Sequence, residues 1–321
     1  MKRRDFLATA PLAATALASP MLAARPASAE AHAMSGGQVP AVQRFAVGDI
    51  TVTAIADGSL HIGPENLIGI EAPDYEELLT ASFRDPATFP SAVNCFLIET
   101  GDQTIMVDAG TASAMGPSLG KMPQNLAAAG VEPGAVTKLL ATHLHPDHVA
   151  GALGEDGAAF FPNAELAVHE ADRAFWTGDF SGAPEMMQTF AGLAGNVLSA
   201  YGERLQIITG EDEVAPGITA MPLPGHTPGH TGYMISSGDA SLLIWADIVH
   251  VAPVQLARPG VAIGFDVDPD QAVATRRETL DRVAADRLMV AGSHIGFPGL
   301  VNITADGEGY RMIPAHWDYS L

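Results

Sequence analysis

The alternation of apolar and polar residues predicts a chain of many short strands and a few helices. Apolar runs with a period of two, or without interruption, are typical of strands. They occur at residues 43–47, 50–56, 93–99, 103–108, 137–142, 164–168, 204–208, 217–221, 232–236, 241–246 and 287–291. Apolar spacing of three and four predicts helices at 119–129, 169–176, 183–200 and 269–285. This distribution indicates two sheets packed together and covered by helices.

One long stretch lacks a clean period. Residues 59–91 contain glycine, proline and scattered aromatic side chains, and we expect a loop there. A loop of that length inside a domain usually serves a function.

The N-terminal residues predict an export signal. A basic start at residues 2–4 precedes an apolar, alanine-rich run, and Ala27-Ser28-Ala29 offers the small residues that a signal peptidase reads. The arginine pair followed by Phe-Leu resembles a twin-arginine signal. A membrane-spanning helix is the weaker alternative, because two prolines interrupt a short run. We therefore expect a periplasmic protein with a signal peptide at 1–29, a flexible arm at 30–41 and a single domain at 42–321.

Charge and cysteine content narrow the classes of partner. The chain has 16 Lys and Arg against 37 Asp and Glu, a formal net charge of −21. Such a surface repels phosphate backbones and anionic lipids, so we expect no nucleic-acid partner and no membrane insertion. Cys95 is the only cysteine, which excludes an intrachain disulfide and predicts a small core side chain.

The segment from His143 to His148 carries the strongest chemical signal. It has the sequence His-Leu-His-Pro-Asp-His and follows an apolar run, so its side chains should emerge at the end of a strand. Three imidazoles and a carboxylate within six residues suit zinc and similar ions. His143 and His145 can chelate one ion, while Asp147 and His148 can begin a second site.

More candidate ligands follow strand-like runs further along the chain. They are His226 and His230 after 217–221, Asp247 after 241–246 and His294 after 287–291. Each is a weak signal alone, since a single polar residue at a strand end is more often a turn residue. Together with the first cluster they gain weight. Composition leaves open which of His226 and His230 is the ligand.

These residues resemble, in order, the motifs of the metallo-β-lactamase superfamily, beginning with Asp108 in Val107-Asp108-Ala109-Gly110. The resemblance implies an α/β fold, a four-layer αββα sandwich of two mixed sheets flanked by helices. It assigns His226 as the ligand and makes Asp108 a structural hydrogen-bonding residue. It implies two metal ions bridged by Asp247, one held by His143, His145 and His226, the other by Asp147, His148 and His294.

Stretches outside these motifs resemble the methyl parathion hydrolase branch, whose members are exported enzymes acting on organophosphate triesters, aryl esters and lactones. The stretches are Val93-Asn94, Phe96-Leu97-Ile98, Phe161-Pro162-Asn163-Ala164, Phe175-Trp176, Ser293-His294, Phe297-Pro298-Gly299 and Gly307 to Pro314.

The motifs that are missing point to water as the nucleophile. The sequence has no Gly-x-Ser-x-Gly elbow, and Cys95 has no obvious catalytic partner. Two divalent ions, expected to be Zn²⁺ with Mn²⁺, Co²⁺ or Fe²⁺ as alternatives, would bridge and activate a hydroxide. Asp247 would hold their spacing, and Asp147 could relay a proton to the leaving group. We therefore take these two as the catalytic carboxylates.

We expect an apolar pocket to bind a small ester, lactone or phosphotriester, because no basic cluster lies near the motifs. Its candidate walls are Phe160, Phe161, Trp176, Met186, Met187, Phe190 and Phe265. Core packing is the more frequent role for any one of them alone, and Trp176 is the favoured pocket residue because the branch carries a pocket-lining aromatic there. With His250 and Ile263, Phe265 should narrow the site, so lactones and aryl esters are the expected substrates and phosphotriesters slow ones.

Other activities of the superfamily fit this sequence less well. Preference for methyl parathion-type triesters is the main alternative. Class B β-lactamases typically lack an aspartate at the bridging position, and persulfide dioxygenases use one iron and fewer ligands. A non-catalytic metal-binding module is a further class, and the sequence is compatible with a homodimer.

Overall fold

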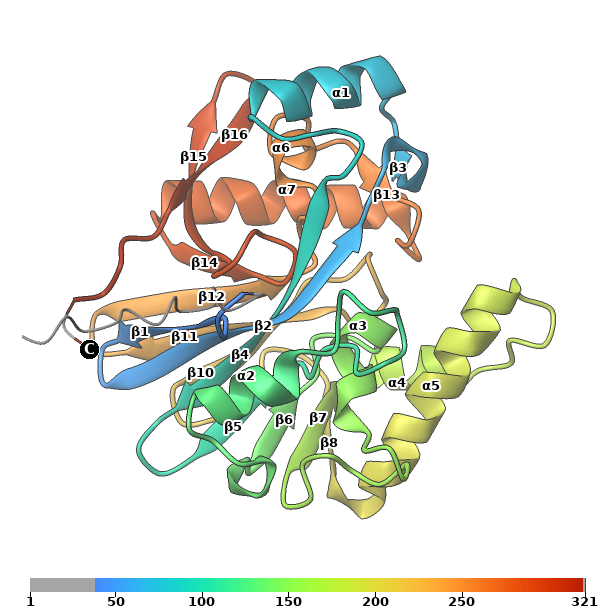
Figure 1. The fold of residues 1–321 in the computed structure, drawn as a ribbon, viewed down its shortest axis with the longest axis vertical. Helices are drawn as coiled ribbons and strands as arrows, with labels where there is room; N and C mark the ends of the chain where they lie inside the picture. The colour runs from blue at the N-terminus through green and yellow to red at the C-terminus, as the bar shows by residue number, and fades with distance from the viewer. Residues whose placement is uncertain (1–37, 320) are drawn as a thin grey trace, which may run out of the picture. The chain divides into compact units, whose positions relative to one another are not determined.

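The computed structural model describes residues 38–319 and 321, of which Val39–Leu321 form one compact unit. The expected signal at residues 1–29 lies outside the described residues, so export stays a prediction. Two seven-stranded sheets make up most of the unit (Figure 1). Among the helices that the structure describes, none is long and apolar enough to cross a membrane.

The first sheet has the order β1-β2-β4-β5-β6-β7-β8. Its strands are β1 (Val42–Val47), β2 (Ile50–His61), β4 (Pro90–Glu99), β5 (Thr104–Val107), β6 (Lys138–Leu140), β7 (Glu165–His169) and β8 (Leu205–Ile208). The pairs from β1 to β5 are antiparallel and those from β5 to β8 are parallel, so the sheet is mixed.

The second sheet has the order β16-β15-β14-β12-β11-β10-β9. Its strands are β9 (Glu213–Ala215), β10 (Ile218–Pro222), β11 (Thr231–Ser237), β12 (Ala240–Ala246), β14 (Met289–Gly292), β15 (Leu300–Asp306) and β16 (Gly309–Pro314). Only β12 and β14 pair in parallel, so this sheet is mixed as well. A small extra sheet joins β3 (Leu67–Ile68) to β13 (Ala262–Ile263).

Helices cover the outer faces of both sheets (Figure 1). The first sheet carries α2 (Met122–Ala128), α3 (Pro146–Val149), α4 (Glu170–Trp176) and α5 (Glu185–Tyr201). The second carries α7 (Pro269–Ala285), while α1 (Ala72–Ala81) and α6 (Ala252–Gln255) pack beside the small sheet. Short 3-10 turns are η1 (Pro64–Asn66), η2 (Pro133–Ala135), η3 (Ala150–Ala152) and η4 (Gly202–Arg204). The predicted αββα sandwich is confirmed.

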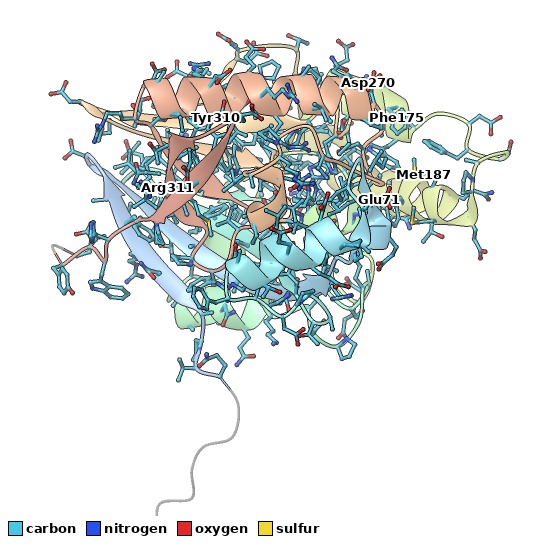
Figure 2. The ribbon with its side chains drawn as sticks, turned by 90° about the horizontal axis from the view of Figure 1, so that it is seen from above. Glu71, Phe175, Met187, Asp270, Tyr310 and Arg311 are labelled. Carbon is cyan, nitrogen blue, oxygen red and sulfur yellow. The ribbon has the colours of Figure 1, made fainter. Side chains whose placement is uncertain are left out.

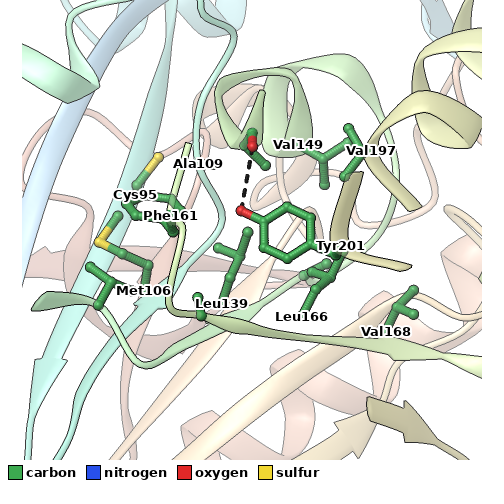
Figure 3. Close-up of a cluster of buried hydrophobic side chains, with 14 of the residues drawn as sticks. Cys95, Met106, Ala109, Leu139, Val149, Phe161, Leu166, Val168, Val197 and Tyr201 are labelled. Carbon is green, nitrogen blue, oxygen red and sulfur yellow. Dashed lines mark hydrogen bonds between the residues drawn. The ribbon is translucent and has the colours of Figure 1, made fainter. Parts of the chain in front are cut away.

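Separate apolar cores lie between these layers. Val52, Ile98, Tyr233 and Ile244 are buried between the two sheets, where residues of one face of each strand meet. A second core joins the first sheet to its helices (Figure 3). In it the Tyr201 hydroxyl donates to the carbonyl of Ala152 at 3.3 Å, so its polar end is satisfied. Cys95 is buried in this second core, as predicted, and burial raises the pKa of its thiol.

The structure corrects the expected loop at residues 59–91. It contains the end of β2, then η1, β3 and the ten-residue helix α1. That helix buries only Tyr75 and Leu79, so its sequence shows too few apolar positions for a period to emerge. Strands β15 and β16 were also absent from the predicted set.

Candidate metal centre

The histidine-rich segment lies where β6 ends and α3 begins. Pro146 starts α3, and proline suits the first helical position because its fixed φ matches the helix and it needs no amide hydrogen. His143 and His145 therefore lie in extended backbone before the helix, while Asp147 and His148 lie in its first turn. The segment thus supplies donors both before the helix and within it, and the rings of His143 and His148 lie 4.0 Å apart.

The other candidate ligands come from the second sheet. His226 lies in the loop between β10 and β11, Asp247 follows β12, and His294 follows β14. All are buried, and the geometry brings them together with the histidine-rich segment. The cluster is therefore assembled from both sheets.

The first donor group consists of three imidazoles. Nδ1 of His145 lies 3.0 Å from Nε2 of His143 and 2.9 Å from Nε2 of His226. Ligand atoms bound to one ion at about 2.0–2.1 Å stand roughly 3.0–3.4 Å apart, so the three nitrogens have close to the spacing of a single coordination shell.

The second donor group contains Asp147, His148 and His294. Oδ2 of Asp147 lies 3.5 Å from Nε2 of His148 and 3.4 Å from Nε2 of His294. Oδ2 of Asp247 lies between the groups, 3.3 Å from Nε2 of His226, 3.2 Å from that of His148 and 3.1 Å from that of His294. One carboxylate thus faces ligands of both groups, the position of a bridge.

Hydrogen bonds on the far side orient the imidazoles. Nδ1 of His148 pairs with Oδ2 of Asp108 at 2.7 Å, and Asp108 also accepts from the amide and hydroxyl of Thr142. Nδ1 of His294 donates to the carbonyl of Ala92 at 2.7 Å. Such partners fix the ring and leave Nε2 free to bind a metal.

Asp266, which sequence reasoning missed, has the same relation to His226. Its Oδ1 lies 2.7 Å from Nδ1 of His226, and its Oδ2 accepts from the amide of Ile263 at 3.0 Å. The only signal in the sequence was an acidic residue beside Phe265, a pocket candidate.

His230 has a different task from His226. Its Nδ1 donates to the carbonyl of Leu223 at 2.9 Å, and its Nε2 accepts from the amide of Asp247 at 3.2 Å. Both ring nitrogens are occupied by backbone, so His230 positions Asp247. Burial, followed by the neighbouring His226, lowers the pKa of His230 to about 3, which keeps it neutral as this pairing requires.

Asp172, also missed, joins the two loops that carry ligands. Its Oδ2 accepts from the amide of Leu144 at 3.0 Å and its Oδ1 from that of Gly229 at 2.7 Å. The side chain is fully buried at the start of α4, and burial raises its pKa. Its place in an otherwise ordinary helix gave no clue to this contact.

The protonation chemistry of the cluster fits a pair of cations. Burial and neighbouring imidazoles lower the pKa of His143 and of His145, which leaves them as neutral ligands. Burial opposes charge on His226, but the hydrogen bonds that its protonated ring donates to Asp247 and Asp266 outweigh burial and raise its pKa to about 9. Bound metal would replace such protons in balancing the carboxylates.

Buried atoms without partners give a second sign of the same fit. Nε2 of His148 and Oδ1 of Asp247 have no hydrogen-bond partner among the described residues. A buried polar atom without a partner is costly, and both belong to ligands of the cluster. The residues therefore fit two metal ions, with Asp247 between them.

A cavity of about 180 Å³ opens onto the cluster. Its lining residues are Leu60, His61, Ile62, Met115, His145, Asp147, Phe190, His226, Asp247, His250, Phe265 and His294. His250, Phe265 and Phe190, which the sequence analysis named as pocket candidates, thus line this cavity. No lysine or arginine is among these lining residues, which agrees with an uncharged substrate.

Two expected wall residues lie behind the cavity instead. Trp176 is fully buried, with its ring 5.4 Å from that of His145 and stacked on Phe180. Ile263 is also fully buried, since β13 pairs with β3 and turns this side chain into the adjacent core. Both shape the site by packing against it and not by lining it.

The remaining candidates lie around α4 and α5. Phe161 is buried in the core between the first sheet and its helices, and Phe160 and Met187 pack against that core. Met187 on α5 and Phe175 on α4 lie at the same side of the ribbon (Figure 2). Met186 is largely exposed and does not line the cavity.

Solved structures share this fold over most of the chain. A hydrolase of the beta lactamase superfamily named AbOPH is 32% identical, covers 88% of this chain and all of its own, and has a TM-score of 0.82. AidC, a dizinc quorum-quenching lactonase solved with the product N-hexnoyl-L-homoserine, is 24% identical, with 87% of this chain and 99% of its own covered and a TM-score of 0.83.

Curated relatives match a smaller part of this chain. An N-acyl homoserine lactonase of Bacillus cereus is 27% identical over 169 residues, 47% of this chain and 60% of its own length. The uncharacterized protein YobT of Bacillus subtilis is 31% identical over 157 residues, 46% and 58% respectively. The chain thus spans about three-fifths of the length of these relatives.

The family model described as the metallo-beta-lactamase superfamily matches residues 88–294, which include β4 to β14 and every ligand of the cluster. The fold, the paired donor groups and this match lead to one conclusion. The chain belongs to the metallo-beta-lactamase superfamily.

Proposed function

We propose that this metallohydrolase cleaves lactones and aryl esters and belongs to the methyl parathion hydrolase-like branch. The observation that carries the proposal is a small cavity without basic side chains that opens directly onto two donor groups joined by Asp247. The partial likeness to N-acyl homoserine lactonases supports the choice of a lactone.

Two divalent ions held by these residues, zinc by preference, would lower the pKa of a water toward neutrality and offset charge that develops on a substrate oxygen. Asp247 would keep the two donor groups in register, since its Oδ2 faces both. Asp147 contributes to the second group and also lines the cavity, which places a carboxylate within reach of the leaving oxygen.

The walls of the cavity favour flat acyl groups. Phe190 and Phe265 present aromatic surface, and Leu60, Ile62 and Met115 add aliphatic surface. A lactone or aryl ester with an apolar acyl part gains by burying it there. A phosphotriester has two alkoxy arms and an aryl group around phosphorus, and needs more room.

The test is a turnover panel on protein loaded with zinc, manganese or cobalt. Acyl homoserine lactones, phenyl acetate, methyl parathion and a β-lactam are compared by kcat/KM. We expect lactones or aryl esters to be cleaved fastest. Preference for methyl parathion over every lactone and ester would move the assignment to a triester hydrolase, and no turnover of any substrate would refute the enzymatic proposal.

Metal content is measured on the same preparations. We expect about two equivalents of metal per chain. A reproducible single iron would contradict the dinuclear site.

A further inference from the structure

Asp57 is a fully buried carboxylate that belongs to none of the donor groups. Its Oδ2 accepts from the amide and the hydroxyl of Thr111, at 3.0 and 2.7 Å, and from the amide of Gly120 at 3.1 Å. Its Oδ1 accepts from the amide of Met122 at 2.9 Å, and its backbone carbonyl accepts from the amide of Lys121 at 3.0 Å. These donors offset the cost of burying the charge. Asp57 therefore joins β2 to both ends of the segment that connects Thr111 to Met122.

The segment between these ends, residues 112–120, forms a closed loop. A Cβ placed on Gly120, whose φ is +77°, would lie 2.3 Å from the carbonyl oxygen of Ala112, so the two ends of the loop touch. Compact loops with adjoining ends are frequently functional. We name this segment the Met115 loop, after the residue that it brings into the cavity at the donor groups.

The Met115 loop and the end of β2 form one wall of that cavity. Met115 is half-buried and lines it together with Leu60 and Ile62. On its other side the loop borders an open cavity of about 790 Å³, to which Gly116 and Pro117 contribute. The cavity at the donor groups holds only about 180 Å³, less than the roughly 300 Å³ at which sites for small molecules begin. The wall that carries Met115 thus limits the space for a substrate, and it has room behind it.

We propose that Asp57 is a positioning residue that holds the Met115 loop against β2 and thereby sets the length of the acyl chain that the enzyme accepts. The proposal rests on the proposed hydrolysis of lactones and aryl esters, and it specifies the acyl part of the substrate. With the loop held in place, Met115 blocks an extended chain. Short acyl groups such as butanoyl are therefore preferred over long ones such as decanoyl.

The first test measures whether Asp57 holds the loop, and it needs no substrate. Hydrogen exchange in peptides spanning residues 111–122 is compared between zinc-loaded wild type and Asp57→Asn. The side-chain NH₂ of asparagine faces amide donors that the carboxylate accepted, so we expect exchange in this segment to become about tenfold faster while that of α7 stays unchanged. Zinc content should remain at the wild-type value. Unchanged exchange in residues 111–122, or loss of zinc, would overturn the positioning role.

The second test measures the preference for acyl-chain length. The substrates are the N-butanoyl and N-decanoyl homoserine lactones and the matching 4-nitrophenyl esters. In Asp57→Asn and in Met115→Ala, we expect the decanoyl-to-butanoyl ratio of kcat/KM to rise about tenfold through KM, with kcat for the butanoyl substrate within about twofold of wild type. Met115→Trp should lower the ratio. Ser113→Ala is the matched control, because Ser113 is exposed on the same loop and does not line this cavity, so its ratio should equal that of wild type.

The two tests separate failure of this proposal from failure of the proposed function. The Met115 variants keep the contacts of Asp57, so they test the wall even if Asp57→Asn folds poorly. A wild-type ratio in Met115→Ala and Asp57→Asn would overturn the proposal. A wild type that cleaves none of these lactones and esters would refute the proposed function and, with it, the acyl-chain role of Met115, while hydrogen exchange would still decide whether Asp57 holds the loop.

Discussion

Oδ1 of Asp266 lies 2.7 Å from Nδ1 of His226, on the side of the ring away from the metal cluster. A carboxylate in this position fixes the tautomer of the imidazole and strengthens it as a ligand. The pair links the loop before α7 to the loop between β10 and β11.

Replacing this carboxylate should weaken metal binding. We expect Asp266→Ala to lower zinc affinity by about 10- to 100-fold, measured by chelator competition. Asp268→Ala is the matched control: its carboxylate caps α7 by accepting from the amide of Gln271, so its removal should cost about 1 kcal/mol of stability and leave zinc affinity intact. Equal zinc affinities in both variants would contradict the role of Asp266.

Substitutions of the two histidines in the loop between β10 and β11 should have different effects, one on metal content and the other on stability. His226→Ala removes a donor, so we expect it to retain about one metal equivalent by elemental analysis. His230→Ala leaves the carbonyl of Leu223 and the amide of Asp247 unpaired, so its unfolding free energy should fall by about 2–4 kcal/mol in urea titration while both ions remain. If the folded His230→Ala variant loses metal, His230 is a metal ligand and not a residue that positions Asp247.

Removing metal should lower thermal stability. The cluster buries two carboxylates and five imidazoles that bound ions would neutralise and connect. Each ion present at about 100 times its Kd would stabilise the fold by about 2.7 kcal/mol, so chelation should lower the Tm and added zinc should restore it. Asp247→Ala should show a smaller shift. If the chelator removes the metal and the Tm does not change, metal binding does not contribute to the stability of the fold.

The cavity wall should set the preference between substrates. Phe265→Ala frees volume beside the cluster, so we expect the ratio of kcat/KM for methyl parathion to that for a lactone to rise about tenfold. Ile263→Val is the control, because this side chain is buried behind the wall and its truncation should cost about 1 kcal/mol without changing the ratio. An unchanged ratio in Phe265→Ala would show that this wall does not limit the substrate.

The sequence predicted the fold and the ligand cluster because both leave local signals. Strands buried on both faces, such as β4, appear as apolar runs with few polar interruptions. The segment His143 to His148 concentrates four candidate ligands in six residues, and each later ligand follows an apolar run. Patterns of this kind can be recognised in the sequence without knowledge of the tertiary structure.

What the sequence did not predict depends on tertiary contacts. Strands β15 and β16 mix buried and exposed positions irregularly, and β16 buries only Gly309, so neither shows a clear period. Asp172 and Asp266 look like ordinary surface acids until the fold brings Leu144 and His226 to them. Trp176 is an aromatic residue of the kind that often lines pockets, but here its side chain packs against His145 and Phe180 and lies in the core.

The spread of the donors along the chain has a consequence for the order of events during synthesis. Residues 143–148 emerge from the ribosome long before His226, and His294 emerges last. Neither donor group is complete until strands of the second sheet have been made, and the group containing Asp147 must wait for β14. Because metal affinity depends on preformed geometry, the nascent chain cannot use an ion as a template for its early folding. Binding of the two proposed ions would therefore follow the packing of the two sheets against each other.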